Sequence, residues 1–199
     1  MTRGGSGTGA GGPGGPEPAG HPLLRLAGAL ETIPRLVGRT VAWLSALMVL
    51  VTFLVVLLRY AFDLGWIAMQ ESVTYMHAAL FMLGAAYTLQ LEGHVRVDIL
   101  YQKRSRRGQA WTDLAGTLLL LFPVTAFIAW IGWEYVSESW RIAEGSREAG
   151  GIAGVWLLKS LILVMPALLL MQGLAGVLRN GLYLAGVTSA LPEDPRTTR

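Results

Sequence analysis

The stretch "VAWLSALMVLVTFLVVLL", residues 41–58, decides the fold class. It contains no charged residue. At 1.5 Å per residue a helix of this length rises about 27 Å, close to the ~30 Å hydrocarbon core of a bilayer. Its apolar residues do not alternate with polar ones, as they would in a strand of an outer-membrane barrel. The stretch therefore predicts a membrane-spanning helix.

Three further apolar segments follow along the chain, at residues 73–91, 114–133 and 152–178. Pro123 and Pro166 lie inside two of them, which is tolerable because neighbouring helices can satisfy the freed carbonyl groups. We therefore expect an all-α membrane protein with four transmembrane helices. The last helix could continue beyond Arg179.

The composition agrees with a membrane protein. Of 199 residues, 53% are hydrophobic and 15% charged, where soluble domains carry about 25% charged residues. The net charge is +3, but no basic face of a soluble domain is evident, so we expect no nucleic-acid partner. The chain lacks cysteine, and no nucleotide-binding loop, HExxH sequence or nucleophile motif occurs. The sequence therefore predicts neither an enzyme nor a bound cofactor or metal.

Both ends of the chain differ from its centre. Residues 1–22 are rich in glycine and proline and predict a disordered tail, while residues 188–199 predict a short polar tail. Residues 23–187 are then one four-helix membrane domain. Within it, residues 23–37 place leucine and alanine at helical spacing, which suggests an amphipathic helix on the membrane surface before the first span. Pro34 is expected to break or restart that helix.

The charges that flank the apolar segments indicate an orientation. Lys and Arg collect before the first segment, between the second and third, and after the fourth. Because basic residues are concentrated on the cytoplasmic side, this pattern places both termini in the cytoplasm. Tryptophans stand near the expected ends of the spans, where aromatic rings favour the interface, at Trp66, Trp111, Trp133, Trp140 and Trp156.

Few ionisable residues fall inside the apolar segments. His77 could relay protons, bind haem, or form a hydrogen bond with a neighbouring helix or subunit. Lys159 could extend its amine to the interface, pair with Glu134 or Glu138, or contact a solute, and pairing is the favoured interpretation. Glu71 stands at the outer end of the second span, where solvation or contact with a partner is expected.

The stretch "LEGHVRVDILYQKRSRR", residues 91–107, separates the second and third spans. An exposed strand edge is not viable in a bilayer, so its alternation is interpreted as an amphipathic helix or tight turn at the inner leaflet. Its second half is strongly basic. We expect contacts with anionic lipid headgroups from Lys103, Arg104, Arg106 and Arg107, each worth about 1 kcal/mol near the surface.

The same stretch carries a family resemblance. Gly93, His94, Val95, Arg96, Val97 and Asp98 resemble a sequence that follows the second span in the small membrane subunit (DctQ type) of tripartite ATP-independent periplasmic (TRAP) transporters. Residues 59–71 and 139–180 are also similar to that family, and the resemblance covers residues 39–180. Family-like positions in the later part are Glu144, Ser146, Trp156, Lys159, Pro166 and Gln172. Ala167 stands where the family often has glycine.

The resemblance implies a function that the residues alone do not. It implies a bacterial inner-membrane complex that imports an organic acid or related solute with a sodium gradient. A periplasmic solute-binding protein (DctP type) captures the solute, and a large membrane subunit (DctM type) carries the transport sites. The small subunit would be a non-catalytic scaffold that packs on the large subunit and helps to dock the binding protein.

Seven residues are candidates for partner or structural contacts under this interpretation: Glu71, His94, Arg96, Asp98, Glu144, Trp156 and Lys159. Arg96 and Asp98 could fix the loop geometry, contact the large subunit, or simply be solvated at the interface. The alternative function is a four-helix membrane protein that carries haem or protons through His77.

Overall fold

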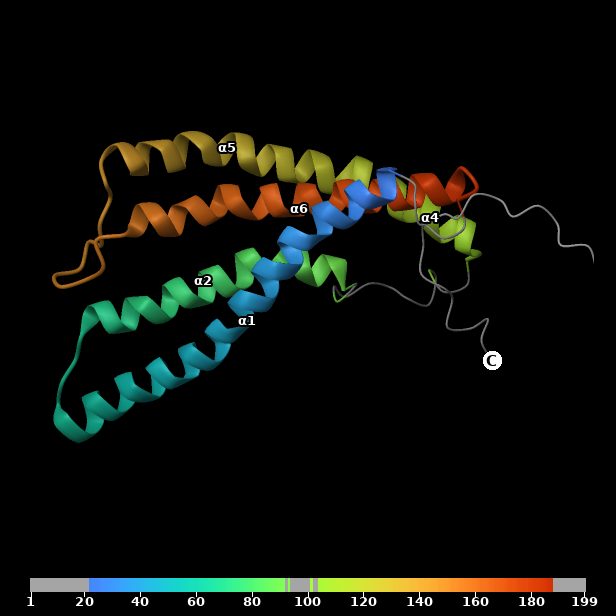
Figure 1. Cartoon of the computed structure of the whole chain (residues 1–199). Helices are drawn as coiled ribbons and strands as arrows, with labels where there is room; N and C mark the ends of the chain where they lie inside the picture. Colours follow the sequence, from blue (N-terminus) through green and yellow to red (C-terminus); the bar gives the residue numbers. More distant parts are fainter. Residues whose placement is uncertain (1–21, 92, 94–100, 102–103, 188–199) are drawn as a thin grey trace, which may run out of the picture.

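The computed structural model describes residues 22–91, 93, 101 and 104–187. The chain runs up and down through long helices (Figure 1). In order they are α1 (Pro22–Phe62), α2 (Ile67–Gln90), α4 (Arg106–Gly116), the π-helical turn η2 (Thr117–Leu121), α5 (Phe122–Arg141) and α6 (Val155–Leu184). The all-α prediction is confirmed for the described residues. The predicted tails, except Pro22, lie outside the described residues.

The two ends of the bundle have different characters. One end carries the α1–α2 connection and the loop of residues 142–154, and is called the loop end (Figure 1). At the other, α1 begins, α2 ends, α4 begins and α6 ends. Arg25, Arg107 and Arg179 lie near these ends of their helices, so it is called the basic end. The predicted contrast in charge between the two ends is thus present in the fold.

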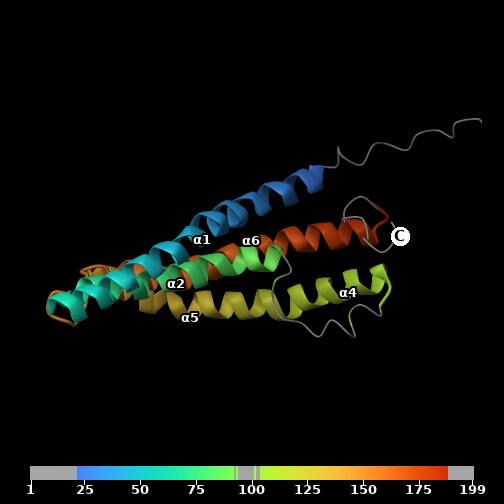
Figure 2. The ribbon, with the colours of Figure 1, turned by 90° about the horizontal axis from the view of Figure 1, so that it is seen from below.

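Among the described residues, three helical stretches are long and apolar enough to cross a membrane: Pro22–Phe62, Arg106–Arg141 and Val155–Leu184. α2 has 24 residues and lies along α1 and α6 (Figure 2). A helix of that length rises about 36 Å. The four-span count remains a prediction, because α2 is less apolar than the other three.

The prediction that residues 23–37 form a helix separate from the first span is wrong, while their position at the membrane surface stays a prediction. These residues are the first part of α1, which continues to Phe62 as one 41-residue helix. Pro34 does not interrupt it. The residue is fully buried, in a stripe of buried α1 residues that recurs every three or four positions: Ala27, Glu31, Pro34, Gly38 and Val41. Burial of this stripe offsets the backbone hydrogen bond that proline cannot donate.

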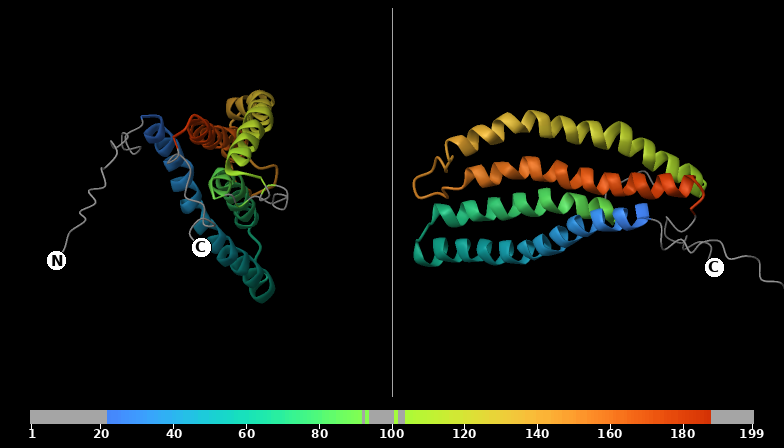
Figure 3. Two further views of the ribbon diagram at one scale, coloured as in Figure 1. Left: turned by 90° about the vertical axis from the view of Figure 1, so that its right-hand side faces the viewer. Right: turned by 45° about the horizontal axis from the view of Figure 1, so that its top comes forward.

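α6 is the central helix of the bundle. It packs against α5, α2 and α1, while α1 and α2 pack on each other and α5 lies on the far side of α6 (Figure 3). Small residues allow two of these approaches. A Cβ on Gly38 would collide with Tyr87 of α2, and one on Gly173 would stand 2.7 Å from Leu121 Cδ2. Close approach through glycine is typical of helices that associate in membranes.

The third predicted span begins earlier than expected. α4, η2 and α5 form one continuous helix from Arg106 to Arg141, where residues 114–133 were expected. The π turn precedes Pro123, and the amide of Phe122 reaches back to the carbonyl of Thr117. A proline ring clashes with the carbonyl four residues earlier and lacks an N–H, so a widened turn at this point keeps the helix continuous.

α5 and α6 end in the same way. Ala143 and Gly186 adopt positive φ values of 47° and 104°. The following amides then bond five residues back, Glu144 N–H to Ser139 O at 3.0 Å and Val187 N–H to Leu182 O at 3.0 Å. This is the Schellman arrangement, in which a left-handed residue closes the helix. At Ala143 it turns the chain back so that Glu144 faces α6.

Candidate functional site

At the loop end, the carboxylate of Glu71 joins α2 to the loop of residues 142–154. One carboxylate oxygen accepts a hydrogen bond from the hydroxyl of Ser146, and the other accepts the amide of Ile152 at 2.7 Å. The loop itself is closed by Ser146 N–H to Ile152 O at 3.0 Å. Glu71, expected from sequence to be solvated or to meet a partner, is therefore a structural contact within the chain.

Gly151 makes this arrangement sterically possible. A Cβ there would meet the Ser146 side chain and stand 2.8 Å from Glu71 Oε2. Only glycine leaves the carboxylate room to reach both donors. The loop between α5 and α6 is thereby fixed by a residue of α2, 75 positions away from Ser146.

Lys159 of α6 pairs with Glu144, at 2.5 Å between Nζ and Oε2. The two side chains are only 15% and 22% exposed, and the amine also lies 3.9 Å from the centre of the Tyr135 ring, within cation–π range. The prediction that Lys159 is paired is confirmed, but the predicted partners Glu134 and Glu138 are wrong. Glu138 instead binds Arg141. The Schellman turn after α5 explains the change, because it brings Glu144 back over α6.

The Lys159 ammonium holds the pKa of Glu144 below its ordinary value of 4.5, mainly through this hydrogen bond. Glu144 is a loop residue, and it also accepts the Trp156 amide with its backbone carbonyl, at 3.3 Å. It therefore remains an anion at neutral pH and links the loop to the first turns of α6 by two contacts.

Trp156 is the fourth predicted site residue at the loop end. Its ring packs edge-on against Trp140, with centroids 4.4 Å apart, and the Trp140 indole N–H donates to the hydroxyl of Ser160 at 2.8 Å. The predicted residues Glu71, Glu144, Trp156 and Lys159 thus come together around one loop, from α2, the loop and α6. Sequence spacing did not show this, because the loop conformation determines it.

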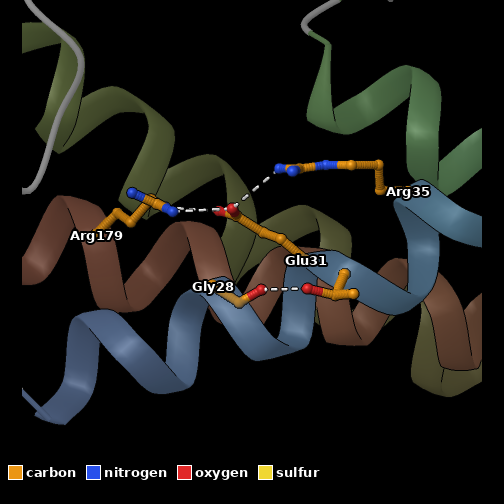
Figure 4. A network of polar contacts seen from close by, with 5 residues as sticks. Gly28, Glu31, Arg35 and Arg179 are labelled. Atoms are coloured by element: carbon orange, nitrogen blue, oxygen red, sulfur yellow. Dashed lines mark hydrogen bonds and ion pairs between the residues drawn. The ribbon is translucent and has the colours of Figure 1, made fainter.

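At the basic end, an ion-pair network joins the first and last helices (Figure 4). Glu31 of α1 accepts two hydrogen bonds from Arg179 of α6, at 2.6 and 2.8 Å, and lies 3.9 Å from Arg35. This pair was not predicted from the sequence. The available signal was the stripe of small residues around Glu31, which shows that the carboxylate faces the bundle.

The basic run before α4 makes contacts within the chain. Ser105 caps α4 by accepting the Gly108 amide at 3.2 Å, and Arg104 donates to Thr112 at 2.7 Å. Arg107 reaches the carbonyl of Leu184, the last residue of α6, at 3.4 Å. Arg107 therefore contacts a helix C-terminus, where a cation is favourable. Headgroup contacts of Arg104, Arg106 and Arg107 stay predictions.

The remaining predicted residues are not brought into either cluster. His77 occupies an exposed position of α2. His94, Arg96, Asp98 and Lys103 lie outside the described residues. The roles suggested for them, including a His77-based haem or proton path, stay predictions.

Comparison with known protein families assigns the chain to one of them. No curated protein and no solved structure matches it. The family described as "Tripartite ATP-independent periplasmic transporters, DctQ component" matches residues 48–180, about two thirds of the chain. This range covers the last part of α1 from Met48, all of α2, α4, η2 and α5, and α6 up to Asn180. The chain therefore belongs to the DctQ family and is a small membrane subunit of a TRAP transporter.

Proposed function

We propose that this chain is the non-catalytic scaffold subunit of a sodium-gradient-driven TRAP transporter that imports an organic acid or a related solute. It packs against the large DctM-type subunit in the bacterial inner membrane and helps to dock the DctP-type binding protein. Family membership supports the class of complex. The observation that supports a scaffold role is the internal use of the chain's charged groups.

The partly buried charges at both ends of the bundle bind one another. Lys159 is neutralised by Glu144, and Glu31 by Arg179. A solute pathway would need such groups to exchange partners with a solute or ion, as intramembrane ionisable residues do in transporters. Groups that brace neighbouring elements instead favour a static role.

The exterior offers apolar area to a membrane partner. Rings on α1 and α5 are highly exposed, among them Trp43, Tyr60, Trp130 and Trp133. Such surfaces suit lipid tails or the helices of a large subunit. Because apolar contact alone does not distinguish them in a bilayer, close packing and polar contacts would select the partner.

The proposed topology has four spans with both termini in the cytoplasm, so the loop end faces the periplasm. Its support is the concentration of arginines at the basic end. The loop of residues 142–154, held by Glu71 and Lys159, would then present a fixed surface on the side where the binding protein arrives.

Reconstitution of uptake tests the proposal. The large subunit and the binding protein are to be placed in proteoliposomes or cells with and without this chain, and solute uptake measured with and without a sodium gradient. We expect sodium-dependent uptake only when this chain is present. Uptake at the full rate without it would overturn the scaffold role.

The periplasmic placement of the loop end has its own test. A single cysteine in place of exposed Glu148 should react with an impermeant maleimide added to intact spheroplasts, because the chain has no native cysteine to interfere. A cysteine in place of Arg25, at the basic end, should react only after lysis. The reverse pattern would contradict the orientation and leave family membership untouched.

A further inference from the structure

A groove of about 1030 Å³ opens at the basic end of the bundle. α6 contributes Leu169, Gln172 and Gly176 to it, while α1 and α2 line one side and α4, η2 and α5 the other. Its volume lies at the upper limit of small-ligand pockets, which span roughly 300–1,000 Å³. On η2 and α5 the lining is largely apolar, through Leu121, Val124 and Ile128 among others.

The side of the groove formed by α1 is basic. Arg35 and Arg39 stand one helical turn apart and both line it. Arg35 is 54% exposed and only 3.9 Å from Glu31, whose two oxygens already accept hydrogen bonds from Arg179. In the part of the chain that the structure describes, Arg39 forms no ion pair or hydrogen bond. Figure 4 shows Arg35 directed at the same carboxylate as Arg179, so one anion is shared by two guanidinium groups.

Two side chains of the groove lining carry amide oxygens that are buried without a hydrogen-bond partner. Gln172 is 8% exposed, and its amide oxygen has no hydrogen-bond partner. The amide oxygen of Gln90, at the end of α2, is likewise buried and unpartnered. Because both oxygens are closed to solvent, an occupant of the open groove does not reach them, and the choice of occupant rests on the arginines and the apolar wall.

We propose that the groove binds one anionic phospholipid, of the phosphatidylglycerol class. Its phosphate lies against Arg35 and Arg39, and an acyl chain fills the apolar part. An apolar helix of another subunit would fill the apolar part but would bury Arg39 without a counter-ion, which is costly. The inference does not depend on the proposed transport function.

Lipid titration of the purified full-length chain tests the proposal. The delipidated protein in detergent is to be titrated with phosphatidylglycerol and with phosphatidylcholine, and bound lipid counted by native mass spectrometry. We expect one tightly held phosphatidylglycerol. Arg35→Gln and Arg39→Gln should each weaken it about fivefold, as expected from about 1 kcal/mol per charge. Arg25→Gln, an equal change of charge on the same helix outside the groove, should have no effect.

A second pair of variants tests the place of binding. Gly176 lines the groove, and a Cβ there would meet no atom within 4 Å, so Gly176→Leu places a side chain in the groove. It should abolish tight binding. Gly181→Leu, equally open and outside the groove, should not. Soluble glycerol phosphate should not compete, because it lacks the acyl chains.

Three outcomes would overturn the proposal. Equal retention of phosphatidylglycerol and phosphatidylcholine would show that the bound lipid is ordinary lipid around the protein. Retention that is unchanged in the Arg35→Gln and Arg39→Gln variants would show the same. Displacement by glycerol phosphate would show a phosphate site without a lipid. Release of the lipid when a stoichiometric large subunit is added would show that a partner helix is the native occupant.

Discussion

Glu31 and Arg179, 148 residues apart, meet through both carboxylate oxygens, with Arg179 Nε 2.6 Å from Oε1 and Nη2 2.8 Å from Oε2. The Glu31 side chain is only 10% exposed. The pair joins the beginning of α1 to the end of α6, and no other contact between charged groups links these helices in the described part of the chain. It therefore closes the bundle at the basic end.

Replacing Glu31 with glutamine should lower the free energy of unfolding by about 1–3 kcal/mol, the usual loss for hydrogen bonds to charged groups. The variant leaves Arg179 facing a neutral side chain in a partly buried site. Thermal unfolding in detergent measures the effect. Glu138→Gln is the matched control, because its pair with Arg141 is exposed and should contribute less than about 1 kcal/mol. Equal effects of both changes would contradict the bracing role of Glu31.

Gly38→Ala should destabilise the contact between α1 and α2. The added methyl group would overlap the Cβ of Tyr87, an atom that cannot move without its helix. We expect a loss of about 1–3 kcal/mol, as for overpacked cores. Gly28→Ala, on the same helix and in open space, should instead stabilise by up to about 1 kcal/mol through helix propensity. Similar melting temperatures for the two variants would show that α1 and α2 do not approach as described.

Glu71→Ala should free the loop of residues 142–154. It removes the acceptors for Ser146 and Ile152, so the amides of both residues should exchange hydrogen at least about tenfold faster, which corresponds to ~1.4 kcal/mol. Hydrogen exchange with mass spectrometry measures the change.

Glu71→Gln should preserve most of the protection of this loop. A glutamine can accept the Ile152 amide and donate to the Ser146 hydroxyl. Glu134→Ala, an exposed change near the same end, is the control and should leave loop exchange unchanged. If the glutamine and alanine variants at position 71 behaved alike, a negative charge rather than hydrogen-bond geometry would hold the loop.

The Glu144–Lys159 pair should make stability depend on acid pH. Because the pKa of Glu144 is lowered in the folded chain, its stabilising effect is complete above its ordinary pKa of 4.5 and is lost as pH falls through the lowered value. Melting temperature measured from pH 7 down to pH 3 should therefore fall more steeply in the native chain than in Lys159→Met. Parallel curves would show that the pair contributes no differential stability.

The sequence was sufficient to predict the helices, because hydropathy and the length of a bilayer span act locally. It predicted the residues at which the helices begin and end less accurately. α1 includes Pro34 since the packing of its buried stripe outweighs the proline penalty, and α5 continues to Arg141 because polar residues can extend a span beyond the apolar core.

Candidate site residues could be identified from the sequence, but which of them contact one another could not. Lys159 was expected to pair along the face of α5, but a left-handed Ala143 redirects the chain and supplies Glu144. Glu31 and Arg179 are brought together only by packing of the first helix on the last. Such long-range pairs depend on how helices are arranged, which one sequence does not specify.

The π turn at Thr117–Leu121 rotates α4 relative to α5 about their common helix axis. Each α-helical residue rotates the chain by about 100°, so a turn that holds one extra residue changes which face α4 presents relative to α5. Deleting one residue there would rotate Gln109, Thr112 and Asp113 by about 100° about the helix axis while leaving α5 in place. The angular alignment of the two halves of this helix therefore depends on a single residue of chain length.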